Sequence, residues 1–230
     1  MNEKILVIIP AYNEARTIKN VVSQVSVNIP QADILVINDC STDDTKNILD
    51  RECINYIDLI SNLGIGGAMQ TGYIYALEND YDIAIQIDGD GQHDPYSINE
   101  MLEPIVKNEY DMVIGSRYIE KTSYKTPILR MLGMLYFRKL ISLITNKRII
   151  DITSGYRLVN KRIIKMFAKD YPKDYPEVEV LVNLSKNGYR ILEIPVEMKA
   201  RETGFSSITP IKSIKYMIKV TFNLMKRAIE

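Results

Sequence analysis

The sequence has little of several features that would point to a particular class of protein. Its two cysteines, Cys40 and Cys53, are too few for a disulfide framework, and nothing near them has metal-thiolate spacing. A reducing compartment fits this content. Lysine plus arginine equals aspartate plus glutamate at 29 each, so no excess of one charge predicts a nucleic-acid partner.

Long hydrophobic runs are also missing. The most apolar stretch, residues 128–144, is interrupted by Arg130, Arg138 and Lys139, so it lacks the roughly 18 uncharged residues of a membrane-spanning helix. The N-terminal apolar run covers only residues 5–10 and has neither a basic leader nor a small-residue cleavage site, which excludes a signal peptide. We expect a cytoplasmic protein, soluble or peripheral at the inner face of the membrane.

Short apolar segments alternate with helical patterns through the first half of the chain. Strands are predicted at 5–10, 33–38, 56–61, 83–88 and 112–116, and helices at 17–27, 42–51, 67–79 and 96–107, the second capped by Ser41. The second half predicts a helix at about 127–145, a strand at 191–198 and a closing helix from about 210. Because the strands are almost continuously apolar, the predicted fold is α/β, with a mostly parallel sheet flanked by helices.

Polar clusters follow three of the predicted strands. In an open parallel sheet, ligands bind beyond the carboxyl ends of the strands, so these clusters should meet at one edge. Each cluster alone could be an ordinary turn. They are Pro10-Ala11-Tyr12-Asn13-Glu14, Asn38-Asp39-Cys40-Ser41 and Asp88-Gly89-Asp90-Gly91-Gln92-His93-Asp94.

The pair Asp88-x-Asp90 is the strongest chemical signal. Two carboxylates at one strand end repel each other unless a cation lies between them, and hard oxygen ligands suit Mg²⁺ or Mn²⁺. Gln92 could add a neutral oxygen ligand. The alternative is a solvated acidic turn, since Asp-x-Asp also occurs by chance.

Across nearly the whole chain, an ordered set of motifs resembles the inverting glycosyltransferases of family 2, especially the branch that transfers sugars to polyprenyl or dolichol phosphate. The motifs are Pro10-x-Tyr12-Asn13-Glu14, Asn38-Asp39-x-Ser41-x-Asp43, Asn62-x-Gly64-x-Gly66, Asp88-x-Asp90-x-Gln92-His93, Gly115-Ser116-Arg117, Ser154-Gly155-Tyr156-Arg157 and Arg201-x-x-Gly204-x-Ser206. The resemblance implies the GT-A nucleotide-sugar-binding fold. Because no linker or internal repeat divides the chain, we expect one domain, 1–230, with a nucleotide-sugar-binding half (1–118) and an acceptor-side half (119–230).

The resemblance also implies roles for individual residues in donor binding. Asp39 would hydrogen-bond the base, Asp88 and Asp90 would hold ribose and metal, and Asn38 departs from the acidic residue usual at its position. The glycine-containing loop would let backbone approach the donor. The remaining expected donor-binding residues are Pro10, Tyr12 and Glu14, which would line the base and ribose pocket, and Asn62 and Gly66 of the loop.

Three arginines are candidates for stabilising the leaving group or the acceptor phosphate: Arg117, Arg157 and Arg201. The guanidinium fork matches phosphate oxygens, although any of them could instead make a surface ion pair.

A general base is needed only if the acceptor is a hydroxyl, because a lipid phosphate is already ionised. Asp151 best matches the family position for such a base, with Glu177 and Glu179 as alternatives whose pattern is more typical of the acidic first turn of a helix. His93, the only histidine, is more typical of a hydrogen-bonded structural residue than of a base.

Basic residues are concentrated in one segment. Residues 121–150 contain seven basic and no acidic side chains among many apolar ones, which is typical of an amphipathic helix at an anionic membrane surface. The same pattern would also suit a helix that buries its apolar face in the core. We expect a peripheral enzyme, or one docked on a small membrane-anchor protein. The seven are Lys121, Lys125, Arg130, Arg138, Lys139, Lys147 and Arg148.

The expected substrates are a nucleotide-diphosphate sugar, UDP slightly favoured over GDP, and a polyprenyl phosphate. Three alternatives stay open: a glycosyltransferase that extends a cell-surface polysaccharide, a sugar-1-phosphate nucleotidyltransferase and a non-catalytic binding protein. The nucleotidyltransferases carry a Gly-rich basic phosphate loop after strand one, where this chain has Pro10-Ala11-Tyr12-Asn13-Glu14.

Overall fold

The computed structural model describes residues 3–119, 128–173, 176–198 and 221–222; the side chains of 128–130 and 132 are not described. Seven strands form one sheet in the order β3-β2-β1-β4-β6-β5-β7, and only β6 runs antiparallel to its neighbours. The strands are β1 (Ile5–Ala11), β2 (Asp33–Asn38), β3 (Tyr56–Asp58), β4 (Ile83–Gln86), β5 (Met112–Ser116), β6 (Arg157–Asn160) and β7 (Ile191–Pro195).

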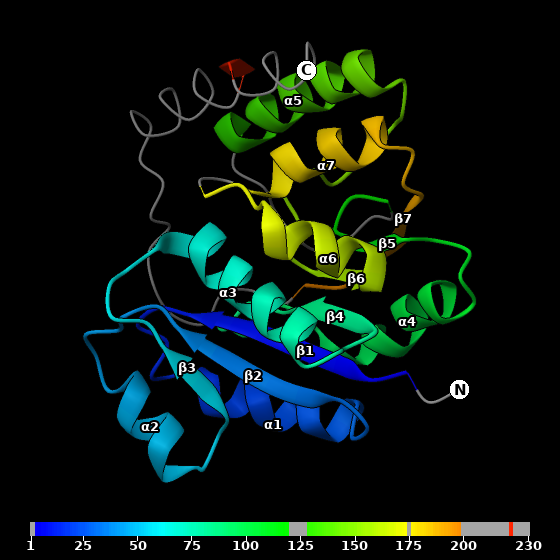
Figure 1. Cartoon of the computed structure of the whole chain (residues 1–230). Helices are drawn as coiled ribbons and strands as arrows, with labels where there is room; N and C mark the ends of the chain where they lie inside the picture. Colours follow the sequence, from blue (N-terminus) through cyan, green and yellow to red (C-terminus); the bar gives the residue numbers. More distant parts are fainter. Residues whose placement is uncertain (1–2, 120–127, 174–175, 199–220, 223–230) are drawn as a thin grey trace.

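Helices cover both faces of this sheet (Figure 1). Alternate residues of β1 therefore enter two separate cores: Ile5, Val7 and Ile9 pack with α1, α2 and α4, whereas Leu6 and Ile8 pack with α3 and the other helices. The helices are α1 (Ile18–Asn28), α2 (Thr45–Arg51), α3 (Gly64–Glu78), α4 (Ile98–Val106), α5 (Ile128–Thr145), α6 (Lys161–Lys169) and α7 (Pro176–Lys186), with a short 3₁₀ turn, η1 (Pro95–Ser97), before α4.

The chain order reverses between β1 and β4. β1 pairs in parallel with β2 on one side and with β4 on the other, so the strands that follow β1 lead away from this point in both directions. The connections after β1 and β4 diverge, which leaves a crevice beyond their carboxyl ends. Two of the predicted polar clusters, 10–14 and 88–94, begin at this crevice.

The predicted α/β fold with a mostly parallel sheet is confirmed, with differences at the ends of some elements. The strands expected at 56–61, 83–88 and 191–198 end earlier, at Asp58, Gln86 and Pro195. The prediction that Ser41 caps the second helix is wrong: α2 starts at Thr45, and Ser41 Oγ instead accepts the backbone N–H of Asn13. The closing helix expected from about 210 lies outside the described residues.

α5 lies at the far edge of the molecule from α1 and α2 (Figure 1). It buries Met134, Phe137 and Ile141 but leaves Leu135 and Leu143 exposed. Within the described part of the chain, no helix is both long enough and apolar enough to cross a membrane.

Candidate active site

A cavity of about 230 Å³ occupies the crevice between β1 and β4. Five of its lining residues carry carboxyl groups, and none of the described lining residues is basic. Ten of the eleven come from the first half of the chain, and Glu177 at the start of α7 is the one from the second half. The lining is Pro10, Ala11, Tyr12, Glu14, Asp39, Ile65, Ala68, Asp88, Gly89, Asp90 and Glu177.

The loop after β1 is bound to the other two polar loops. Asn13, at a φ of 59°, accepts the backbone N–H of Thr42 on its side-chain oxygen at 2.8 Å, and the backbone N–H of Glu14 donates to Thr45 Oγ1. Thr17 Oγ1 donates to the carbonyl of Gly89 at 2.7 Å. These bonds bring three distant motifs together around one cavity.

Asp39 is engaged by the start of α3. Its two carboxylate oxygens accept the backbone N–H groups of Leu63 and Gly64 at 2.7 and 2.8 Å, which are among the N–H groups left unpaired at a helix start. Asn62 Nδ2 donates to the Asp39 carbonyl at 3.2 Å. Asp39 is therefore held rigidly at the cavity wall, and Asn62 supports it without lining the cavity itself.

Gly66 also lies outside the cavity lining. It is buried in the first turn of α3, where an added Cβ would lie 2.2 Å from the carbonyl oxygen of Pro172 and 2.3 Å from that of Lys173. The close approach that requires glycine here is therefore to the chain's own backbone. This packing places Ile65 and Ala68 in the cavity wall.

Asp88 and Asp90 face the same cavity, as their spacing predicts. Asp90 Oδ1 accepts the backbone N–H of Gln92 at 3.0 Å. Within the described ranges, no three His, Cys, Asp or Glu side chains are arranged to hold a metal ion by themselves. The protein thus offers two carboxylates, and further ligands for a cation would have to come from neutral groups, water or substrate.

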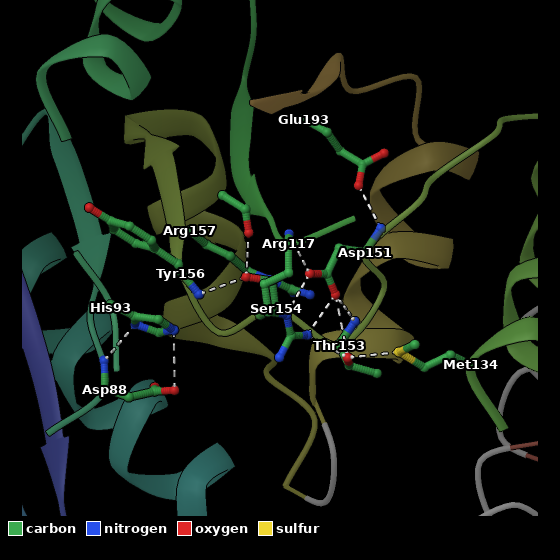
Figure 2. A network of polar contacts seen from close by, with 11 residues as sticks. Asp88, His93, Arg117, Met134, Asp151, Thr153, Ser154, Tyr156, Arg157 and Glu193 are labelled. Carbon is green, nitrogen blue, oxygen red and sulfur yellow. Dashed lines mark hydrogen bonds and ion pairs between the residues drawn. The ribbon is translucent and has the colours of Figure 1, made fainter. Parts of the chain in front are cut away.

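Arg117 and Asp151 form a buried ion pair outside the cavity (Figure 2). Nε and Nη2 of Arg117 donate to the two Asp151 oxygens at 2.7 Å each, and the Arg117 backbone N–H donates to Oδ2. Burial by itself raises the pKa of Asp151, but the Arg117 guanidinium more than offsets it and holds this pKa below its usual value. A fully buried carboxylate that is kept ionised in this way is better suited to positioning the loop between α5 and β6 than to taking a proton.

Glu193 of β7 was not predicted as a functional residue. Its carboxylate accepts the backbone N–H groups of Ile150 and Asp151, each at 2.6 Å, while Arg117 Nη2 also donates to Thr153 Oγ1. Thr153 Oγ1 in turn lies 3.7 Å from Met134 Sδ on α5. The one sequence signal for Glu193 is a charged residue within an otherwise apolar strand.

Arg157 is buried behind the cavity, with 2% of its surface exposed. Its Nε donates to the carbonyl of Ser154 and its Nη2 to the carbonyl of Glu177, at 2.7 and 2.8 Å, and Nη1 has no hydrogen-bond partner within the described residues. Arg157 therefore fixes the first turn of α7. Arg201 lies outside the described residues.

Glu177 and Glu179 lie in the same helical turn but in different surroundings. Glu177 lines the cavity, where burial raises its pKa; Arg157 lowers this pKa and the Asp88 carboxylate raises it further. Glu179 is buried outside the cavity lining. Of the two alternative bases, only Glu177 faces the predicted donor site.

The fold and the motif positions define the class of this protein. Residues 6–167 match the family model described as glycosyl transferase family 2, so the chain belongs to that family and is a glycosyltransferase. The chain is similar in fold to glucosyl-3-phosphoglycerate synthase from Mycobacterium tuberculosis, with a TM-score of 0.76 and 17% identity over 98% of this chain and 78% of that one. This likeness confirms the GT-A fold.

Relatives over most of the chain include two named transferases. An undecaprenyl-phosphate mannosyltransferase of Micrococcus luteus is 29% identical over 221 residues, covering 90% of this chain and 88% of that protein. A UDP-N-acetylglucosamine–dolichyl-phosphate N-acetylglucosaminyltransferase of Methanococcus voltae is 30% identical over 213 residues, covering 84% of each.

The Arg117–Asp151 pair generates a prediction about stability and pH. Asp151→Asn should lower the free energy of unfolding at pH 7 by about 3–5 kcal/mol, because it leaves a buried guanidinium without its counter-charge. Since the pKa of Asp151 is lowered by folding, its stabilisation is present above about pH 4 and is lost as the pH falls through the lowered pKa. The difference from the wild type should therefore shrink in acid. Urea denaturation between pH 3 and pH 8 measures it.

Asp80→Asn is the matched control, because Asp80 is 85% exposed and pairs with Lys161 at the surface. We expect a change within about 0.5 kcal/mol. If the Asp151→Asn protein were as stable at pH 7 as the Asp80→Asn protein, the assignment of Arg117 and Asp151 as a stabilising buried ion pair would be contradicted.

Proposed function

We propose that this chain transfers a glycosyl group from a nucleotide-diphosphate sugar to a polyprenyl phosphate at a membrane surface. The observation that carries the proposal is the cavity at the β1/β4 crevice, where Asp88 and Asp90 meet the base-side residues Tyr12 and Asp39. A nucleotide that spans this cavity would have its base near Asp39 and its diphosphate near the aspartate pair. The expected ribose contacts come from Glu14 and Asp88.

The acceptor is proposed from the relatives. The names of the M. luteus and M. voltae proteins specify different sugars, mannose and N-acetylglucosamine, but both specify a polyprenyl-type phosphate acceptor. The shared part of the chemistry is therefore the acceptor. The sugar has to be determined separately, because it depends on a few contacts that vary within the family.

UDP is the donor nucleotide that we favour. The M. voltae relative is named for a UDP-sugar, and the M. tuberculosis structure is of a complex with Mn²⁺ and uridine diphosphate. A base held by Asp39 at the rigid start of α3 would be selected by its hydrogen-bonding edge. Asn38 lies beside this residue and donates to Asp58, with its own side-chain oxygen lacking a hydrogen-bond partner in the described part of the chain.

A divalent cation, Mg²⁺ or Mn²⁺, fits the residues of this cavity. Among the described lining residues, five carry carboxyl groups and none is basic; these carboxyl groups would repel a diphosphate, and a positive charge that accompanies the donor would offset this repulsion. We propose Asp88 and Asp90 as the protein ligands, with the side-chain oxygen of Gln92 as a neutral third ligand. When bound, the cation supplies charge that stabilises the departing nucleoside diphosphate.

The acceptor chemistry requires little of a general base. A phosphate oxygen of the acceptor would form a bond to the anomeric carbon as the bond to the diphosphate oxygen breaks, with its electron pair leaving on the diphosphate. The product is inverted at this carbon. Because the attacking phosphate is already ionised, Asp151 can serve to position Arg117 and the loop around Ser154, and Arg157 to fix Glu177 in the cavity.

The membrane-facing surface is proposed to be the outer face of α5. The proposal is supported by α5, which buries one apolar face in the core and exposes other apolar side chains. Lys139 and Arg148 are exposed nearby, whereas Lys121 and Lys125 lie outside the described residues. The exposed apolar side chains are Met131, Leu135, Tyr136 and Leu143, with Leu143 the most exposed at 75%.

We propose peripheral attachment at the inner face of the cell membrane, either directly or through a small membrane protein that docks on this face of α5. Direct attachment would combine burial of these apolar side chains with attraction of the basic ones, each contributing about 1 kcal/mol near an anionic surface. Thr153 lies in the loop between α5 and β6 and contacts both Met134 of α5 and Arg117. It would therefore connect this surface to the Arg117–Asp151 pair.

A transfer assay tests the proposed reaction. The protein is incubated with a panel of radiolabelled UDP- and GDP-sugars, Mg²⁺ or Mn²⁺, and polyprenyl phosphate. Label should move into the organic phase for one donor. Asp90→Asn should lower this rate at least about 100-fold, because it weakens the charge that offsets the leaving diphosphate.

Asp80→Asn serves as the control, since Asp80 is exposed and lies in the turn before β4, at the opposite end of that strand from the cavity. It should leave the rate unchanged. Synthesis of a nucleotide sugar, transfer to a soluble glycan only, or full activity of Asp90→Asn would contradict the proposal.

Vesicle flotation tests the membrane surface. We expect the wild type to float with vesicles that contain anionic lipid, and Leu135→Glu/Leu143→Glu to lose this binding because charge replaces the apolar contact. Val27→Glu is a matched control: Val27 is 76% exposed on α1, at the opposite side of the molecule (Figure 1). If the wild type bound neither these vesicles nor a co-expressed membrane protein, the attachment proposal would fail.

A further inference from the structure

His93 is buried between the candidate metal site and the acceptor-side half of the chain. It is the only histidine in the sequence, and 4% of its surface is exposed. One edge of its ring faces Asp88 and one face stacks on Tyr156 (Figure 2). Neither the predicted donor contacts nor the predicted catalytic residues account for this arrangement.

The hydrogen bond to the backbone of Asp88 decides where the ring proton lies. The N–H of Asp88 donates to His93 Nδ1 at 3.1 Å, so Nδ1 must offer a lone pair. The proton of the neutral ring is then on Nε2, which lies 3.6 Å from Asp88 Oδ2. The ring thus accepts a hydrogen bond from the backbone of Asp88, and its Nε2 lies near the Asp88 carboxylate at a distance slightly longer than a hydrogen bond.

Tyr156 holds the ring in this orientation. The two rings are 4.8 Å apart and 13° from parallel, and the Tyr156 hydroxyl donates to the carbonyl of Asp94 at 3.0 Å. The backbone N–H of Tyr156 donates to Ser154 Oγ, which donates to the carbonyl of Gly115 at 2.6 Å. The imidazole is therefore fixed by the Ser154-Gly155-Tyr156 segment, which belongs to the other half of the chain.

Gly155 confines the Asp88 carboxylate as well. A Cβ built on Gly155 would lie 3.0 Å from each of the two Asp88 oxygens, closer than real Cβ atoms usually approach. A larger residue at position 155 would require the Asp88 carboxylate to shift by a few tenths of an ångström. Asp88 is therefore held by the His93 ring and by the backbone of this segment, although its own side chain is 37% exposed toward the cavity.

We propose that His93 is a positioning residue: its ring, with Nδ1 accepting the backbone N–H of Asp88 and the N–H on Nε2, orients the Asp88 carboxylate for the cation and donor. This inference rests on the proposed function, because it takes Asp88 to be a cation ligand. Ligand carboxylates that are oriented by a hydrogen-bonding neighbour bind their metal more tightly, and loss of such a neighbour typically weakens binding about 10- to 100-fold.

Nuclear magnetic resonance tests the proton position in the wild-type protein. With ¹⁵N-labelled histidine, the single histidine gives one pair of ring-nitrogen signals, and their couplings to the two ring carbon-bound protons tell Nδ1 from Nε2. The expected result at neutral pH is a protonated Nε2 and an unprotonated Nδ1. A proton on Nδ1, or on both nitrogens, would overturn the proposal whether or not the protein transfers a sugar.

Two substitutions separate orientation of the carboxylate from support of the backbone. His93→Gln retains an N–H donor near the Nε2 position, whereas His93→Asn retains an acceptor near Nδ1 for the backbone of Asp88. The affinity for Mn²⁺ in the presence of UDP is measured by electron paramagnetic resonance of the free ion. His93→Asn should lose about 10-fold or more, and His93→Gln should retain most of the affinity.

A purely structural role predicts the opposite order, because the acceptor retained in His93→Asn would then be the group that matters. Equal affinities of both variants and the wild type would also contradict the proposal. Thermal unfolding of each variant shows whether it folds, and the resonance experiment stands even if one does not. The transfer assay could fail while Nε2 proves to be protonated and the Mn²⁺ affinities follow the expected order. That combination would contradict the proposed reaction alone and leave the role of His93 supported.

Discussion

The arrangement depends above all on repulsion between carboxylates gathered around one cavity. Asp39, Asp88, Asp90, Glu14 and Glu177 all line it, and the described lining has no basic side chain. Asp39 is stabilised by two N–H groups at the start of α3, and Asp88 is confined by His93 and Gly155. Asp88 and Asp90 still face the cavity together. A cation that arrives with an anionic donor would relieve the repulsion between these two carboxylates and would be bound by them.

The fold produces this concentration of charge by bringing together, at one crevice, motifs that are distant in sequence. β1 and β4 lie side by side with their carboxyl ends at one crevice, and the loop after β1 is hydrogen-bonded to the loops after β2 and β4. β6 runs antiparallel next to β4 and brings Arg157 and the Ser154–Tyr156 turn beneath the aspartates. Residues 119–198 therefore contribute mainly support, through Arg157, Tyr156 and Asp151, which pairs with Arg117, and one cavity residue, Glu177.

The sequence predicted the fold class and much of the cavity because both depend on local patterns. Buried strands read as apolar runs, and polar residues at strand ends marked Pro10, Tyr12, Glu14, Asp39, Asp88 and Asp90. The roles of Gly66, Glu193 and His93 could not be obtained in this way, because each depends on a partner far along the chain or on a ring orientation. Gly66 meets Pro172, and Glu193 caps the backbone at Ile150. The pairing of Arg117 with Asp151 joins residues 34 positions apart, so two predicted catalytic groups turned out to contact each other.

Crystals grown with UDP and Mn²⁺ would test the central claim most directly, since the anomalous scattering of manganese locates the ion independently of the protein model. The account predicts one strong peak in the cavity between β1 and β4, at coordination distance from oxygens of Asp88 and Asp90 and of the diphosphate. A diphosphate bound in this cavity with no manganese beside the two aspartates, or manganese bound only elsewhere, would contradict it.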